Sequence, residues 1–191
     1  MTTVYFVRHA EADHTVHEGA VRPLTAKGRA DCALVVSFFE GKRLDCLFTS
    51  PYRRAIETVT PLAERHGLAP VIIQGFFERL SDTDMTRRTE GWESFMERQW
   101  REPGYTYSDG ESLQTVQNRN IAALNKLLAA HEGESFAIGT HGTALSTIIN
   151  YYDASYGYVD FKAMERLTPW IVVMEFEQLA CKSIDKINIL I

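Results

Sequence analysis

The stretch VYFVRHAE, residues 4–11, gives the strongest indication of how this chain folds. Its first four residues form a β-branched and aromatic run that is apolar on both faces, which is typical of a central strand buried on both sides. Polar side chains begin directly after this run, with Arg8 and His9. The sequence therefore predicts a buried strand that delivers charged groups to one edge of a sheet.

The rest of the chain alternates between strand-like and helix-like segments. Three further runs have the same apolar character: residues 45–49, 70–74 and 136–140. Between these runs and the first strand, helical periodicity is present over residues 25–40, 51–66 and 112–131. In the first of these helices, Ala30, Leu34 and Phe38 fall on one side. This alternation favours an α/β fold, a three-layer α/β/α sandwich with a mostly parallel central sheet.

Two segments depart from this alternation. Residues 170–176 and 182–190 are strand-like runs around a short turn, and we expect them to form a closing hairpin. Residues 77–111 are rich in charged and aromatic side chains, with weak apolar periodicity. We interpret them as a small cap-like insertion within one domain that spans residues 1–191. The insertion would lie over the carboxyl ends of the strands, where open α/β sheets bind ligands.

Composition excludes several classes of protein. Of the 191 residues, 45% are hydrophobic and 24% are charged, as in ordinary globular chains. The net charge of −5 argues against a nucleic-acid partner, which usually requires a basic face. The three cysteines are far apart in the sequence, which predicts small buried side chains in a reducing compartment. The chain has no signal-like start and no run near the roughly 20 apolar residues of a membrane span, so we expect a cytoplasmic protein without a membrane partner.

Two more polar clusters follow buried strands, at residues 49–55 and 139–143. Parallel strands would bring both clusters to the edge that holds Arg8 and His9, so that two histidines and at least two arginines converge. In the cluster at 49–55, Ser50 is a good N-cap and Pro51 a good first helical residue. The helix would begin there, with its positive end facing the same edge and Arg54 in its first turn.

These residue types suit phosphoryl transfer. The guanidinium group is always charged, and its planar fork matches phosphate oxygens. A neutral imidazole can attack phosphorus, and two nearby guanidinium groups disfavour its protonated form. The same cations would stabilise charge on the transferring oxygens, while a carboxylic acid could protonate the leaving alkoxide. The set predicts a reaction through a phosphohistidine.

The ordered motifs resemble those of the histidine phosphatase superfamily, also called the phosphoglycerate mutase-like family. They comprise Arg8-His9-Ala10-Glu11, Pro23-Leu24-Thr25 with Gly28, Ser50-Pro51-Tyr52-Arg53-Arg54-Ala55 with Thr58, Gly110-Glu111-Ser112 and Thr140-His141-Gly142. They occur in the family's order from residue 4 to about residue 145. The resemblance implies a phosphoglycerate mutase-like fold and chemistry that needs neither a metal nor another cofactor.

The resemblance also implies a role for individual residues. His9 would accept the phosphoryl group, which Arg8, Arg54 and His141 would bind. Arg54 is preferred to Arg53 because the family's arginine immediately precedes the alanine. Glu78 resembles the proton donor, although the nearby carboxylates leave alternatives: Glu11, Asp82 and Asp84. Two hydroxyl groups close to the motifs could donate to the bound anion, those of Thr15 and Thr143.

Several alternatives stay open at this point. His14 and His17 could form a metal cluster with His9, but their spacing is not a recognised zinc pattern. His66 and His131 are interpreted as structural or solvated residues near helix ends. The aromatic residues Trp92, Trp100 and Tyr107 either pack in the cap or include one that touches substrate. Four arginines of the same segment could form a solvated face or include one that holds a second anionic group: Arg87, Arg88, Arg98 and Arg101.

The preferred function is a phosphomonoester hydrolase, an enzyme that acts on a small phosphorylated metabolite. The compact length and the stretch after Glu78, which does not match the substrate-binding stretch of the mutases, favour the phosphatase branch. A phosphoglycerate mutase that depends on 2,3-bisphosphoglycerate is the nearest alternative, and a non-catalytic module that binds a phosphorylated ligand is the second. The sequence leaves the substrate open, and it leaves open whether the chain is a monomer or a homodimer.

Overall fold

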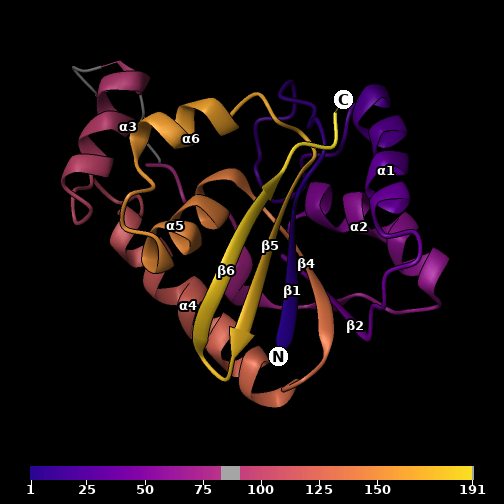
Figure 1. Cartoon of the computed structure of the whole chain (residues 1–191). Helices are drawn as coiled ribbons and strands as arrows, with labels where there is room; N and C mark the ends of the chain where they lie inside the picture. Colours follow the sequence, from indigo (N-terminus) through magenta and orange to yellow (C-terminus); the bar gives the residue numbers. More distant parts are fainter. Residues whose placement is uncertain (83–90, 191) are drawn as a thin grey trace.

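The computed structural model describes residues 1–82 and 91–190, in which a six-stranded sheet has the order β3-β2-β4-β1-β5-β6 (Figure 1). β1, β2, β3 and β4 are mutually parallel, whereas β5 runs antiparallel to β1 and β6 antiparallel to β5. The strands are β1 (Thr2–Arg8), β2 (Cys46–Thr49), β3 (Val71–Ile72), β4 (Ser135–Thr140), β5 (Trp170–Glu177) and β6 (Ala180–Ile187). The predicted mostly parallel sheet and the closing hairpin are both present.

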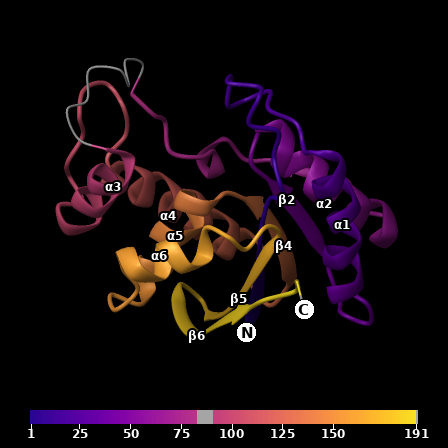
Figure 2. The ribbon, with the colours of Figure 1, turned by 90° about the horizontal axis from the view of Figure 1, so that it is seen from above.

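Helices cover both faces of this sheet. Figure 2 shows α1 and α2 on one side, with α3, α4, α5 and α6 on the other. The helices are α1 (Ala26–Phe38), α2 (Arg53–His66), α3 (Trp92–Arg101), α4 (Leu113–Ala130), α5 (Gly142–Tyr152) and α6 (Tyr158–Met164), with a 3-10 turn η1 (Gln74–Phe76) after β3. The three-layer α/β/α sandwich is therefore confirmed. Across the described residues, none of the helices combines the length and apolar character needed to cross a membrane.

The first strand shows why the sequence folds in this way. In β1, Val4 and Phe6 point into the core shared with α4 and α5, while Val7 belongs to the core shared with α1 and α2. All three side chains are completely buried. Alternation along a strand sends successive side chains to opposite faces, so a run without polar residues needs an apolar layer on each side. β1 accordingly lies between β4 and β5, away from the sheet edges.

Two expectations about element boundaries are wrong. The run at 70–74 contributes only the two-residue strand β3, whose side chains Val71 and Ile72 are half exposed, because β3 is the edge strand. The helix expected from residue 51 begins at Arg53, with Tyr52 as its N-cap. The hydroxyl oxygen of Ser50 accepts the N–H of Tyr52 at 3.2 Å and so caps the turn that precedes the helix.

The buried face of α1 also differs from the expected one. Ala30 is exposed, and Leu34 and Phe38 are only partly buried. The helix instead buries Gly28, Cys32 and Val35. At Gly28 the backbone of Glu11 lies so close that a Cβ atom would overlap its carbonyl oxygen. The absence of a side chain at Gly28 lets α1 pack closely against the chain that follows β1. In this orientation the helix face with Gly28, Cys32 and Val35, and not the face with Ala30, points toward the sheet.

Candidate active site

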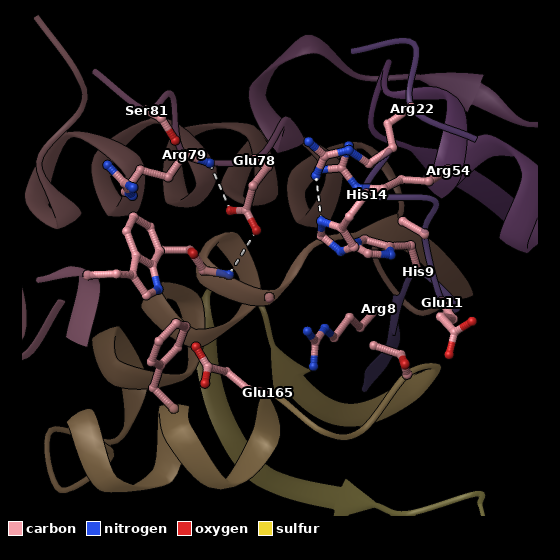
Figure 3. Close-up of a pocket in the computed structure, with 16 residues that line it drawn as sticks. Arg8, His9, Glu11, His14, Arg22, Arg54, Glu78, Arg79, Ser81 and Glu165 are labelled. Carbon is pink, nitrogen blue, oxygen red and sulfur yellow. Dashed lines mark hydrogen bonds between the residues drawn. The ribbon is translucent and has the colours of Figure 1, made fainter. Parts of the chain in front are cut away.

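A cavity of about 390 Å³ opens at the carboxyl ends of β1 and β4 (Figure 3). It is lined by residues from the β1 end, the loop that follows it, the α2 start, the segment after η1, α3, the α5 start and the chain around α6. The predicted site residues among them are Arg8, His9, Arg54, Glu78 and Thr143. Segments that are far apart in the sequence therefore meet at the edge where the sequence placed the ligand site.

Two guanidinium groups are buried beside this cavity. Arg8, the last residue of β1, is 9% exposed, and its Nη1 donates to the carbonyl oxygens of Met164 at 2.5 Å and Leu167 at 2.9 Å. Arg54, in the first turn of α2, is 5% exposed and donates from Nη1 to the carbonyl oxygen of Gly19 at 2.6 Å. Burial lowers the pKa of Arg8 to about 10, and burial also lowers the pKa of Arg54. Both side chains stay cationic at neutral pH.

The ring of His9 is held in one tautomer. Its Nδ1 lies 2.7 Å from the carbonyl oxygen of Ala10. A carbonyl oxygen only accepts hydrogen bonds, so Nδ1 carries the proton and Nε2 of the neutral ring carries a free lone pair. Burial lowers the pKa of His9 well below its ordinary value, and the charges of Arg54 and Arg8 lower it further. The ring is therefore neutral at physiological pH.

α2 holds the backbone that carries this ring. The hydroxyl oxygen of Thr58 accepts the N–H of Ala10 at 3.0 Å and donates to the carbonyl oxygen of Arg54 at 2.7 Å. Thr58 is 1% exposed. One buried hydroxyl thus ties the loop after β1 to the helix turn that supplies Arg54.

His141 lies beside His9 but does not line the cavity. It is completely buried at the N-cap of α5, with its ring centre 5.3 Å from that of His9. Its Nε2 lies 2.6 Å from the hydroxyl oxygen of Ser50, and the Tyr52 ring packs against it at 5.2 Å. Burial and the charge of Arg54 lower its pKa well below the ordinary value. His141 is therefore adjacent to His9 on the side that faces the protein interior and not the cavity.

The carboxylate of Glu78 sits across the cavity at the N-terminus of α5. Its Oε2 accepts the N–H of Thr143 and its Oε1 that of Ala144, both at 3.1 Å, while Oε1 also accepts the N–H of Arg79 at 2.8 Å. Helix N-termini stabilise carboxylates through these unpaired N–H groups and the helix dipole. Figure 3 shows Glu78 facing His9 and Arg54 from the opposite wall. The structure therefore places a hydrogen-bonded carboxylate on the wall of the cavity across from His9.

Of the two hydroxyl groups expected to donate to the bound anion, those of Thr15 and Thr143, only that of Thr143 belongs to a residue that lines the cavity. Thr143 is 8% exposed and lines the cavity. Thr15 is exposed, and both its N–H and its hydroxyl donate to Asp13 Oδ1, at 3.0 and 2.7 Å. Thr15 is not among the residues that line the cavity, so the structure does not support its expected contact with the anion.

The competing residues are also separated. Arg53 points outward, where its Nε pairs with Glu57 at 2.6 Å, so the choice of Arg54 agrees with the geometry. Glu11 lines the cavity, whereas Asp82 is buried and accepts the N–H groups of Ser108 and Gly110.

Among the aromatic residues, Trp92 lines the cavity, and Trp100 packs on Tyr156 and Phe161. Asp84, Arg87 and Arg88 lie outside the described residues.

Sequence reasoning considered His14 only as a possible metal ligand and missed four other polar residues that line the cavity: Arg22, Arg79, Ser81 and Glu165. The Nη1 of Arg22 lies 3.2 Å from His14 Nδ1 (Figure 3). Arg79 is 7% exposed and packs over the Trp92 ring at 5.4 Å. An arginine directly after Glu78 could have been singled out as a signal, but nothing local marks Arg22 or Glu165. A smaller cavity of about 260 Å³ shares Arg22 and Arg79 and extends the binding space.

The arrangement can bind a phosphate group and accept it. Two buried cations flank a neutral imidazole, and the Nε of Arg8 has no hydrogen-bond partner within residues 1–82 and 91–190. A buried donor without a partner is costly unless a ligand satisfies it, and guanidinium groups bind phosphate oxygens well. The site therefore combines an anion-binding pocket, a nucleophile and a carboxylate on the far side.

Comparisons with known proteins agree with this geometry. The family model described as "Histidine phosphatase superfamily (branch 1)" matches residues 4–182. A relative named "Probable phosphoglycerate mutase GpmB", from Cronobacter sakazakii, is 26% identical over 161 residues, which cover 78% of this chain and 74% of the relative. Another relative, "Uncharacterized phosphatase PhoE" from Bacillus subtilis, is 28% identical over 154 residues, which cover 78% of this chain and 76% of the relative.

A solved structure shares the fold over nearly its whole length. Bacillus stearothermophilus YhfR superposes with a TM-score of 0.78 at 24% identity, covering 95% of each chain. That likeness speaks to the fold, whereas the family model matches the sequence from the first strand to the last. Because the sequence match and the observed fold agree, we conclude that this chain belongs to the histidine phosphatase superfamily, whose members are phosphatases and mutases.

Proposed function

We propose that this protein is a phosphomonoester hydrolase that acts through a phosphohistidine on a small phosphorylated metabolite. The observation that carries the proposal is the state of His9. Its Nδ1 proton is committed to the carbonyl oxygen of Ala10, and its pKa is lowered by burial and by the two flanking arginines. A neutral imidazole with a free Nε2 between two guanidinium groups is suited to attack a phosphate ester.

The reaction proceeds in two displacements. In the first, His9 Nε2 attacks phosphorus, the ester P–O bond breaks, and Glu78 donates a proton to the leaving oxygen. In the second, water attacks the phosphohistidine, the P–N bond breaks, and the Glu78 carboxylate takes the proton of the water. The products are the free alcohol, inorganic phosphate and the original enzyme. Glu78 is suited to both steps because it faces His9 from the opposite wall of the cavity (Figure 3).

Arg8 and Arg54 bind the oxygens of the transferring group in this scheme. Both line the cavity, and their guanidinium groups match the charge that spreads over the oxygens in the transition state. Thr143 adds the hydroxyl of the α5 N-terminus. His141 has a role once the group has been transferred, because its ring lies 5.3 Å from that of His9 and closes the buried side of the phosphohistidine.

Hydrolysis is preferred to the mutase reaction because of the segment that follows Glu78. Residues 80–84 do not match the substrate-binding stretch of the mutases, and two polar groups of this stretch, on Leu80 and Asp82, serve structural contacts. The N–H of Leu80 donates to Glu111 Oε2 at 2.9 Å, and Asp82 Oδ1 accepts the N–H of Ser108 at 2.7 Å. We propose that residues 77–111 act as the cap that selects the substrate, since Arg79, Ser81 and Trp92 already line the cavity.

We propose that the protein resides in the cytoplasm. The reason is that none of its three cysteines, Cys32, Cys46 and Cys181, forms a disulfide, as is usual in a reducing compartment.

Phosphate release from a panel of phosphorylated metabolites tests the hydrolase proposal directly. We expect the wild-type protein to release inorganic phosphate from at least one metabolite without a bisphosphate primer, and His9→Ala to lose turnover while it keeps the fold. Isomerised product that requires the primer would support the mutase instead. Ligand binding without turnover across the whole panel would support a binding module, and substantial activity in His9→Ala would refute the covalent route.

A further inference from the structure

A second polar cluster lies at the end of the sheet opposite the cavity. It consists of Cys46, the first residue of β2, His131 at the C-cap of α4, and Glu134 just before β4. In Figure 1 this end is marked by the N-terminus, where β1 begins, and the turn between α4 and β4 lies there. The six residues of β4 separate Glu134 from His141, so the cluster lies about 20 Å from the active site.

The three side chains converge on one small volume. Cys46 Sγ lies 3.6 Å from His131 Nδ1 and 3.4 Å from Glu134 Oε2, and the last two atoms are 2.8 Å apart. All three residues are partly buried. Among the described residues they form the one group of at least three His, Cys, Asp or Glu side chains with the spacing of metal ligands. We propose that Cys46, His131 and Glu134 form a zinc-binding site that is separate from the active site.

The distances fit tetrahedral coordination. With Zn–S near 2.3 Å and Zn–N or Zn–O near 2.0–2.1 Å, a tetrahedral ion separates sulfur from nitrogen or oxygen by about 3.6 Å. The same geometry separates nitrogen from oxygen by about 3.4 Å. The two contacts of Cys46 Sγ already match, while the contact between His131 and Glu134 must lengthen by about half an ångström. A small rotation of the partly exposed Glu134 side chain provides this change.

A hydrogen-bonded catalytic triad does not explain the cluster equally well. A relay through histidine uses both ring nitrogens, one toward the nucleophile and the other toward the carboxylate. Here the same atom, His131 Nδ1, faces both Cys46 Sγ and Glu134 Oε2. Three potential ligand atoms that face one another around a common centre suit an ion, which each of them can contact at once.

The surroundings hold the histidine in place. The ring of His131 packs edge-on against Phe48 and Phe136, with centres 5.2 and 5.8 Å away. Its side chain is 24% exposed, which leaves the site accessible from solvent. Next to the cluster, Asp45 Oδ2 accepts the N–H of Ser135 at 2.9 Å and ties the starts of β2 and β4 together. The backbones that supply two of the ligands are thus fixed relative to one another.

The ligand chemistry identifies the ion. A thiolate, an imidazole and a carboxylate together suit zinc, whereas magnesium and calcium prefer oxygen ligands alone. Water would complete the tetrahedron at the fourth position. Since Cys46 and His131 are 85 residues apart, the ion would cross-link the start of β2 to the end of α4 and stabilise the folded chain.

Zinc titration of untagged, chelator-treated protein tests this inference. Calorimetry should show one zinc ion bound per chain, without comparable binding of magnesium. At a free zinc concentration near 100 times Kd, the melting temperature should rise by about 5–10 °C. Cobalt in place of zinc should give a thiolate-to-metal charge-transfer band, which reports directly on the sulfur ligand.

Variants separate this site from other sources of zinc affinity. Cys46→Ser and Glu134→Gln should each weaken zinc binding roughly 100-fold or more, and Cys46→Ser should abolish the cobalt band. The matched controls Cys181→Ser, another partly buried thiol, and Glu132→Gln, an exposed carboxylate of the same turn, should bind zinc as the wild type does. His9→Ala should also retain binding, which excludes an ion at the active site. Absence of one-to-one binding, or unchanged binding in both ligand variants, would overturn the proposal.

Discussion

Replacing Glu78 by glutamine tests the proposed proton donor with little change in shape. Glu78 Oε1 accepts the N–H groups of Arg79 and Ala144, and Oε2 accepts that of Thr143. A glutamine whose oxygen takes the Oε1 position keeps the first two hydrogen bonds and turns its NH2 group toward the N–H of Thr143. One hydrogen bond is lost, which corresponds to about 1 kcal/mol of unfolding free energy. The variant should therefore stay folded and remain fit for kinetic comparison.

The kinetic effect should depend on the leaving group. General acid catalysis typically contributes roughly 10²–10⁴-fold, so kcat/KM for an alkyl phosphate should fall by that factor, or about 3–5 kcal/mol in barrier height. p-Nitrophenolate departs without a proton, so kcat/KM for p-nitrophenyl phosphate should fall by about 10-fold or less. The parameter kcat/KM is the appropriate measure because it reports the steps up to phosphoryl transfer to His9 and excludes hydrolysis of the phosphohistidine.

Equal losses for the two substrates would refute the assignment, because a residue that only binds or positions the substrate does not distinguish leaving groups. Glu11→Gln is the matched control, since Glu11 is another carboxylate that lines the cavity. We expect it to change kcat/KM for both substrates by a similar, smaller factor. A selective loss in Glu11→Gln and none in Glu78→Gln would transfer the role to Glu11.

Two further predictions concern stability. Burial lowers the pKa of His9 and His141, so below about pH 6.5 the unfolded chain binds protons that the folded chain does not, and the free energy of unfolding falls as pH falls. From pH 7 to pH 5 we expect a loss of at most about 2 kcal/mol per histidine in urea titrations, which is the limit for a ring that stays neutral in the folded chain over this range. The loss should be smaller in His9→Ala than in the wild type, and equal pH dependence in both proteins would contradict this account. Gly28→Ala should destabilise the protein by roughly 1–3 kcal/mol, because the new Cβ would overlap the Glu11 backbone. Gly104→Ala, whose Cβ would meet no atom within 4 Å, should leave the thermal unfolding midpoint nearly unchanged, and equal midpoints in both variants would argue against the close approach at Gly28.

The sequence was informative where local pattern and burial coincide. The apolar run at residues 4–7 predicts a strand with no exposed face, and β1 has helices on both sides. The apolar run at 70–74 predicts a similar buried strand, but it forms only the short, half-exposed edge strand β3. The sequence was misleading here because an edge position depends on which strands pair and not on the composition of the strand itself. The helix that became α5 was not predicted, since its start coincides with the polar cluster around His141.

In the candidate active site too, some residues carry a local sequence signal and others do not. Arg8, His9 and Arg54 could be predicted because each lies at or shortly after the carboxyl end of a buried strand, and parallel pairing brings these strand ends together. Their neighbours Arg22 and Glu165 come from loops and helix ends that carry no local signal. Thr15 shows the converse, because it is close to His9 in sequence while its hydroxyl is committed to Asp13.

By itself, the sequence determined the family of folds and pointed to the residues that we propose as nucleophile and phosphate-binding cations, because strand burial and side-chain chemistry are local properties. Only the tertiary structure decided that His9 is neutral with its lone pair on Nε2, that His141 is sealed behind it, and that Glu78 is held by the N-terminus of α5. The same holds for Cys46 and His131, which are distant in the chain and adjacent in space. The physical reason is that protonation state and convergence depend on burial and on neighbours brought in from other segments, which no stretch of sequence contains.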